Sequence, residues 1–276
     1  MSLLSVRLTV DYPKRPGVLR NCALDIAAGE ILGLVGESGS GKSTLALSIM
    51  RLLPENSARV QGSIVYADHD LMRLKPSDMR AIRGREIAMV LQSPIASLNP
   101  ALRIGTQMAE AWRAHAPDKH EWRERALEAF HLVRLNGGGD LLNRYPRQLS
   151  VGQAQRVLIA MAILHRPRLI IADEPTSALD AITASEILAL FKSLNHELNM
   201  AILFISHDLL SVASLCERVA ILDHGAIVET GATEQLFSTP RHQYTRALLG
   251  AIPRQLGNLA RAVSEEPVSA AALQQR

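Results

Sequence analysis

The sequence predicts an α/β fold with a parallel sheet at its centre. Short apolar runs at residues 31–35, 169–173 and 201–205 are typical of strands that are buried on both faces. Between residues 152 and 222 such strands alternate with helical patterns, which implies parallel pairing through right-handed crossovers. Hydrophobic residues make up 47% of the 276-residue chain, which is enough for a large core. We therefore expect one large ordered domain that carries a smaller subdomain.

The elements can be placed in order along the chain. Residues 3–35 read as short strands broken by turns, and a glycine-rich loop then leads into a helix over 45–53, which Pro54 ends. The later elements are expected as strands at 62–68 and 87–92, mostly helix over 101–135, helix 152–164, strand 169–173, helix 181–196, strand 201–205, helix 208–216, strand 218–222 and short helices near 233–249.

The C-terminal part combines a hairpin with a polar tail. Residues 221–228 predict two short strands joined by a turn at His224 and Gly225. The tail after Pro253 is rich in Ala, Ser, Gln and Glu, and we expect it to be loosely held.

Composition argues against several classes of protein. No apolar run reaches the roughly 18 to 20 residues of a membrane-spanning helix, and residues 1–14 lack the pattern of a secretory leader. These features predict a cytosolic chain. Cys22 and Cys216 lie far apart in the sequence and are expected to be packed thiols. The densest basic patch, at residues 73–85, has five basic residues, and the chain is only 4% aromatic, so we expect no nucleic-acid partner.

A phosphate-binding motif follows the first buried strand. The stretch from Gly36 to Ser43 matches G-x-x-x-x-G-K-[ST], in which glycines let backbone N–H groups point at phosphate oxygens at the start of a helix. Lys42 would reach the β- and γ-phosphates, and the Ser43 hydroxyl would bind Mg²⁺. The alternative is a structural glycine-rich turn. The candidate nucleotide-binding residues are Gly36, Ser38, Gly39, Ser40, Gly41, Lys42, Ser43 and Thr44.

Polar side chains also follow two other predicted strands. Strand 169–173 ends in Asp173 and Glu174, so that Asp173 would bind Mg²⁺ and Glu174 would be the general base for the attacking water. Alone, this pair can be an ordinary turn before Pro175. His207 follows strand 201–205 and would contact the γ-phosphate, although an isolated histidine is often structural. Because all three strands would end at one edge of the sheet, we favour the functional interpretation.

The stretch from Leu149 to Gln153 resembles the signature of ATP-binding cassette (ABC) ATPases, and the resemblance covers nearly all of residues 1–250. It implies a P-loop NTPase core with a parallel sheet, an N-terminal antiparallel β-subdomain and an inserted α-helical signature subdomain at about 93–160, followed by a tail at 251–276. It also implies ATP and Mg²⁺ as cofactors. The residues that it adds are Tyr12 against adenine, Gln92 for Mg²⁺ and catalysis, and Ser150, Gly152, Gln153 and Asp180 at the nucleotide.

The signature predicts a dimer. Ser150 and the first N–H groups of the following helix would form a second anion site, which in the family closes over nucleotide held by the opposite subunit. Val151 departs from the pattern, which usually has glycine here. Either φ at this position is negative and little is lost, or the β-branched side chain weakens the composite site. We favour the first alternative.

Two segments resemble the ATPases of oligopeptide, dipeptide and nickel importers, namely residues 92–100 and 242–249. The resemblance implies a D-type subunit that couples ATP binding and hydrolysis to uptake of peptides or nickel and other metal chelates. Peptide-type members of the family often continue into a cysteine-rich stretch, and this chain has no cysteine after Cys216, so the resemblance favours metal chelates without excluding peptides. The implied partners are two integral membrane permease subunits, a second ABC ATPase that is homologous or identical, and an extracytoplasmic solute-binding protein. The implied location is the cytoplasmic face of the inner membrane.

Three other interpretations compete with the importer. A soluble ABC ATPase that acts on ribosomes or DNA generally has two cassettes or a long coiled-coil insertion, and the sequence shows neither. A P-loop kinase or GTPase would not need the stretch from Leu149 to Gln153. The intact set of Lys42, Asp173, Glu174 and His207 argues against a non-catalytic regulatory cassette.

Overall fold

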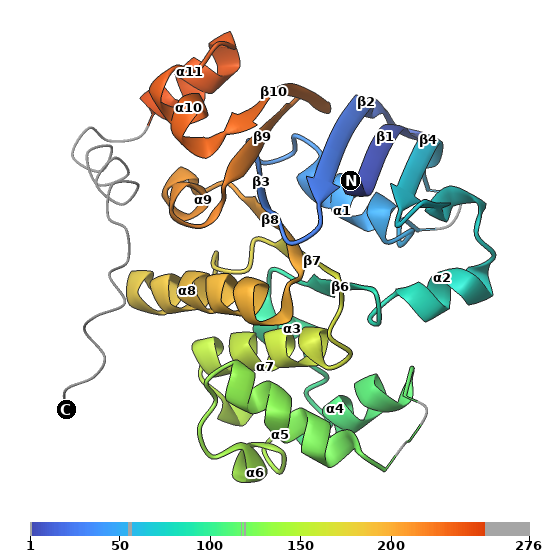
Figure 1. Ribbon diagram of the computed structural model, residues 1–276, viewed down its shortest axis with the longest axis vertical. Helices are drawn as coiled ribbons and strands as arrows, with labels where there is room; N and C mark the ends of the chain where they lie inside the picture. The colour runs from blue at the N-terminus through green and yellow to red at the C-terminus, as the bar shows by residue number, and fades with distance from the viewer. Residues whose placement is uncertain (1, 55–56, 117, 119, 252–276) are drawn as a thin grey trace.

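A parallel sheet lies at the centre of the protein, which confirms the predicted α/β fold. The computed structural model describes residues 2–54, 57–116, 118 and 120–251. Among these residues the central sheet has six strands in the order β10-β9-β3-β8-β7-β6, and within it β10 alone pairs antiparallel (Figure 1). The strands are β3 (Ile31–Val35), β6 (Ile87–Val90), β7 (Leu169–Asp173), β8 (Ala201–Ser206), β9 (Arg218–Asp223) and β10 (Ala226–Ala232).

The register of the parallel strands brings their carboxyl ends to one edge of the sheet. Val35 at the end of β3 pairs with Ser206 of β8, and Asp173 at the end of β7 pairs with Ile205 of β8. The segments after β3, β7 and β8 therefore all begin at the edge where open parallel sheets bind their ligands.

A second, antiparallel sheet contains the N-terminal strands, as predicted. Its order is β2-β1-β4-β5, with β1 (Ser2–Tyr12), β2 (Arg15–Ala27), β4 (Arg59–Tyr66) and β5 (His69–Asp70). The strand predicted at 62–68 begins earlier, because residues 59–61 also pair with β1, and it ends at Tyr66, because Ala67 and Asp68 have positive φ angles of 45° and 67° and form a turn. This segment continues into two short helices that the sequence analysis did not predict, η1 (Leu71–Arg73) and α2 (Pro76–Ile82).

Each face of the parallel sheet packs against a different layer. On β3, Leu32 and Leu34 join a core with the antiparallel sheet and with helix α1 (Lys42–Ile49), whereas Ile31 and Val35 join a core with the later helices. β3, β7 and β8 are buried along their whole length. This burial explains why they read as continuous apolar runs.

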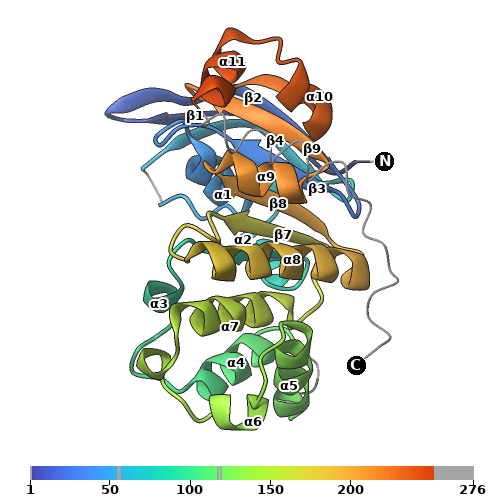
Figure 2. The same cartoon turned by 90° about the vertical axis from the view of Figure 1, so that its left-hand side faces the viewer.

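The helices of the second layer extend away from the antiparallel sheet (Figure 2). Helix α8 lies next to the parallel sheet and α7 lies next to α8. Helices α4, α5 and α6 lie at the end of the molecule opposite α10 (Thr233–Ser238) and α11 (Gln243–Gly250). The bounds are α3 (Pro94–Ser97), α4 (Ile104–Arg113), α5 (Trp122–Leu132), α6 (Gly138–Leu141), η2 (Pro146–Gln148), α7 (Val151–Ile163), α8 (Ala181–Leu198) and α9 (Leu209–Leu215). Every helix in the described ranges is too short or too polar to cross a bilayer.

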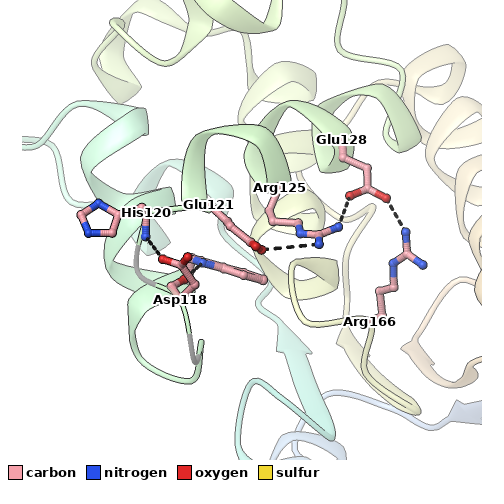
Figure 3. A network of polar contacts seen from close by, with 7 residues as sticks. Asp118, His120, Glu121, Arg125, Glu128 and Arg166 are labelled. Atoms are coloured by element: carbon pink, nitrogen blue, oxygen red, sulfur yellow. Dashed lines mark hydrogen bonds and ion pairs between the residues drawn. The ribbon is translucent and has the colours of Figure 1, made fainter.

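A polar network joins helix α5 to the segment after α7 (Figure 3). Arg125 contacts Glu121 at 3.5 Å and Glu128 at 3.1 Å, and Glu128 also pairs with Arg166. The Cζ atom of Arg125 lies 5.9 Å from the centre of the Trp112 ring on α4. These groups are partly exposed, so each ion pair contributes little stability by itself. Together they connect α4, α5 and the segment after α7 at the surface.

The C-terminal hairpin forms where it was predicted. His224 and Gly225 join β9 to β10 with φ angles of 43° and 83°, which is the pattern of a type I′ turn. Helices α10 (Thr233–Ser238) and α11 (Gln243–Gly250) follow. The tail predicted after Pro253 lies outside the described residues.

Candidate functional site

At two positions of the loop between β3 and α1, only glycine fits. A Cβ atom at Gly36 would lie 2.2 Å from the Leu222 carbonyl oxygen of β9. Gly41 has a φ of 111°, and a Cβ there would lie 2.8 Å from both the Val18 oxygen and the Leu19 side chain. The backbone of the loop therefore packs directly against β2 and β9, which requires glycine at these two positions.

The loop ends at a helix terminus that suits an anion. Gly41 is the N-cap of α1, no side chain caps the helix, and the first turn contains no acidic residue. The unpaired N–H groups and the positive end of the helix dipole therefore attract negative charge.

Lys42 lies folded over this loop. Its side chain is buried, and its Nζ donates to the carbonyl oxygens of Gly36 at 2.7 Å and Glu37 at 2.9 Å. Burial lowers the pKa of Lys42 from its ordinary value, whereas the carboxylates of Glu174 and Asp173 raise it. The ammonium group is thus held at the loop with two carboxylates nearby.

Asp173 and Ser43 fit a divalent cation. The Oδ1 atom of Asp173 is buried with no hydrogen-bond partner in the described structure. Burial raises the pKa of Asp173, and the Ser43 hydroxyl and the Lys42 ammonium partly counteract that rise. A buried carboxylate oxygen without a partner beside a hydroxyl is a donor set that Mg²⁺ prefers.

Glu174 is held between Gln92 and His207. Its Oε2 accepts a hydrogen bond from Gln92 Nε2 at 2.8 Å, and its Oε1 lies 3.1 Å from His207 Nδ1. The backbone of Glu174 has a φ of 48°, which side-chain-bearing residues rarely adopt, and its N–H donates to the Ile205 oxygen of β8 at 2.9 Å. Such strain is typical of functional sites, because the surroundings fix an otherwise unfavourable conformation.

A hollow of about 700 Å³ lies over the phosphate loop, a size suited to a small-molecule ligand. Its lining includes these predicted site residues: Tyr12, Ser38, Gly39, Gly41, Lys42, Ser43, Thr44, Gln92 and Glu174. Of the other predicted site residues, Gly36 and Ser40 belong to the same loop, Asp173 lies buried, and His207 contacts Glu174.

The lining also contains residues that the sequence analysis missed. Lys14 lies in the turn between β1 and β2 and Arg15 is the first residue of β2, and together they bring two positive charges to the hollow. Two adjacent basic residues, separated from the candidate adenine-contacting Tyr12 only by Pro13, were the signal that could have found them. Val18 and Ser57 carry no comparable signal.

The signature residues form a separate site. Ser150 caps α7, since its Oγ accepts from Gln153 N at 3.2 Å while Gln153 Oε1 accepts from Ser150 N at 3.1 Å. Asp180 caps α8, since its Oδ1 accepts from Ile182 N at 3.1 Å and Thr183 N at 3.0 Å, and hydrogen bonds from Thr183 lower its pKa. Ser150, Gln153 and Asp180 line a hollow of about 420 Å³, together with Gly152, and this hollow shares no lining residue with the first.

Val151 has an ordinary helical backbone, so that replacing the signature glycine with valine causes no backbone strain. It is the first residue of α7, it does not have a positive φ, and 41% of it is exposed. A β-branched residue fits this position, so that no strain arises from the missing glycine.

We expect Val151→Gly to change the ATPase rate less than tenfold, because the substitution relieves no strained φ. The check is the steady-state rate of phosphate release at saturating MgATP, with the partner subunits present. A gain above tenfold would instead indicate that the valine side chain obstructs the composite site.

Comparisons with known proteins agree with this geometry. The family model of ABC transporters matches residues 19–177, more than half of the chain, and the model of the oligopeptide/dipeptide transporter C-terminal region matches residues 228–274. A putative peptide import ATP-binding protein of Brucella abortus (strain 2308) is 46% identical over 229 residues, which cover 83% of this chain and 69% of that protein. The glutathione import ATP-binding protein GsiA of Escherichia coli O157:H7 is 43% identical over 268 residues, which cover 92% and 42%.

Solved structures of ATP-binding cassettes have the same fold. A dimeric post-hydrolysis state of the cassette MJ0796 bound to ADP and Pi superposes with a TM-score of 0.71 at 30% identity, over 83% of this chain and 98% of that one. The cbiO1 protein of Clostridium perfringens, part of the ABC transporter complex cbiONQ, gives 0.74 at 25% identity, over 94% and 99%. The protein described here therefore belongs to the ABC transporter family, as one of its ATP-binding and ATP-hydrolysing chains.

Proposed function

We propose that this chain is the ATPase subunit of an importer for short peptides. Support comes from relatives that are named for peptide import and glutathione import, glutathione itself being a short peptide. The match of residues 228–274 to the oligopeptide/dipeptide C-terminal region supports the same class of cargo. The sequence alone favoured metal chelates, because the chain has no cysteine after Cys216. Nickel chelates are therefore the alternative cargo, and the experiment below distinguishes them from peptides.

We further propose that residues 1–250 act as one ABC ATPase domain with a helical subdomain at about 93–160, bound to the cytoplasmic face of the inner membrane. The partners would be two permease subunits, a second ABC ATPase and an extracytoplasmic solute-binding protein. Leu91 and Ile95 flank Gln92 and are 45% and 43% exposed. We propose that a permease docks on this segment, at Leu91 and at Ile95 of α3, because the segment from residue 92 to 100 resembles that of importer ATPases and because both apolar side chains are open to a partner.

The single observation that carries the catalytic assignment is the position of Glu174. In the proposed reaction a water oxygen attacks the γ-phosphorus of ATP while the bond from that phosphorus to the bridging oxygen breaks. Glu174 accepts the proton of the water, and ADP and phosphate leave. Gln92 and His207 hold the two carboxylate oxygens in place.

Other residues stabilise the charge that develops on the phosphates. Lys42 and the N–H groups at the start of α1 would bind the β- and γ-phosphates. Ser43, Asp173 and Gln92 would hold Mg²⁺, which when bound neutralises phosphate charge. The second hollow, around Ser150, would contribute to the nucleotide site of the other ATPase subunit.

The proposal is tested with the whole importer in proteoliposomes, reconstituted with its permeases and its solute-binding protein. We expect short peptides to stimulate ATP hydrolysis and to accumulate inside the vesicles, and a complex with Glu174→Gln to do neither. Stimulation by nickel chelates without any by peptides would overturn the cargo assignment. Failure of the chain to assemble with the permeases would favour a soluble ABC ATPase.

A further inference from the structure

The C-terminal segment of the chain contacts the phosphate loop directly. The hydroxyl oxygen of Tyr244 on α11 accepts a hydrogen bond from the backbone N–H of Glu37 at 3.1 Å, across 207 residues of sequence. Tyr244 is outside every motif that the sequence analysis assigned to nucleotide binding. Its hydroxyl therefore connects a region beyond the core motifs to the first half of the loop.

Glu37 is the residue through which this contact reaches Lys42. The Glu37 carbonyl oxygen accepts from Lys42 Nζ at 2.9 Å and from Ser40 N at 3.2 Å. Glu37 is thus held at its N–H by α11 and at its oxygen by the ammonium group that would bind phosphate. If Glu37 moves, the position of the lysine head group changes with it.

The place of Tyr244 is fixed from the other side by β10. The Glu229 carboxylate accepts hydrogen bonds from the backbone N–H groups of Arg241 at 2.8 Å and His242 at 3.0 Å. His242 in turn caps α11, its Nδ1 accepting from Tyr244 N at 3.3 Å. The Tyr244 ring packs against the core that Ile31 and Val35 of β3 form with the later helices. The hydroxyl therefore sits at the end of a braced segment and not on a free surface helix.

The hairpin that leads into β10 touches the same loop. Gly225 N donates to the Ser40 oxygen at 3.0 Å, and the Gly225 oxygen accepts from Arg20 N at 2.8 Å. The loop thus has contacts from the β9–β10 turn at Ser40 and from α11 at Glu37. Both contacts come from the part of the chain that follows the catalytic residues.

We propose that Tyr244 is a positioning residue for ATP, which holds the phosphate loop in its binding conformation through Glu37. A loop that is already ordered loses less conformational freedom when nucleotide binds, so the contact raises affinity. The inference rests on ATP binding, which the family establishes, and does not depend on the proposed cargo. It gives the C-terminal segment a function at the nucleotide.

Tyr244→Phe tests this proposal because it removes the hydroxyl and leaves the ring packing intact. We expect the affinity for MgATP and for MgADP to fall about twofold to fivefold, the effect of one partly exposed hydrogen bond. The KM for ATP should rise by the same factor while kcat changes little. In the nucleotide-free protein, hydrogen exchange of the Glu37 amide should become faster. Tyr66→Phe is the matched control, because its hydroxyl contacts Glu86 away from the hollow.

A double-mutant cycle separates positioning from general destabilisation. Glu229→Ala removes the anchor of α11, and we expect its loss of nucleotide affinity to be less than additive with that of Tyr244→Phe, because both act through the same contact. The melting temperature of each nucleotide-free variant reports any loss of folding. Nucleotide affinity and Glu37 exchange in Tyr244→Phe equal to those in Tyr66→Phe would overturn the proposal. Fully additive losses would also overturn it.

Discussion

The Glu174→Gln chain should bind ATP and fail to hydrolyse it. We expect turnover to fall by about 10² to 10⁴, the range that a general base contributes. The amide keeps the size of the carboxylate and can still contact Gln92 and His207, so the hollow and its phosphate contacts stay intact. What it loses is the ability to take a proton from the attacking water.

Binding without turnover should also trap the dimer. If nucleotide is held between the phosphate loop of one subunit and the Ser150 turn of the other, MgATP should shift Glu174→Gln to twice the mass in size-exclusion chromatography with light scattering. Glu110→Gln is the matched control, since Glu110 is exposed on α4 and makes no ion pair with any described residue. It should hydrolyse ATP as the wild type does. Wild-type turnover by Glu174→Gln, with its correct partner present, would show that another group is the base.

Most of the fold could be predicted because its central strands are unambiguous. β3 and β7 were predicted with their observed bounds, since a short apolar run that ends in glycine or acidic residues has few alternatives. The helix after the loop was less clear. It begins at Lys42 and not at residue 45, because its first turn, from Lys42 to Thr44, is polar and belongs to the motif. Apolar periodicity marks only the packed part of a helix.

The residues of the site were predictable one by one, whereas their contacts were not. Gln92 and Glu174 lie 82 residues apart, and only the fold shows that they share a hydrogen bond. The structure also shows that Ser150 and Asp180 each cap a helix with a side-chain oxygen, which the sequence analysis did not predict. Tyr244 lies in the segment 242–249 that resembles importer ATPases, but the sequence did not indicate its contact with Glu37, since a single hydroxyl contact between distant segments leaves no spacing pattern.

Lys42→Ala should abolish tight nucleotide binding. We expect the Kd for MgATP to rise about tenfold to 100-fold, the value of a hydrogen bond to a charged group. Two effects add. The phosphates lose a cation held within the loop, and the Gly36 and Glu37 oxygens lose the donor that keeps the loop closed.

The dependence on salt distinguishes Lys42 from a surface charge. Because Lys42 is buried, the difference in Kd between wild type and Lys42→Ala should persist at 0.5 M salt, where interactions between exposed charges are largely screened. Lys192→Ala is the control, since Lys192 is exposed on α8, and it should bind MgATP as the wild type does at both salt concentrations. The measurement is titration with a fluorescent nucleotide, accompanied by the rise in melting temperature that MgATP causes. A Kd for Lys42→Ala within twofold of the wild-type value would mean that the N–H groups of the loop and of α1 bind the phosphates without the lysine.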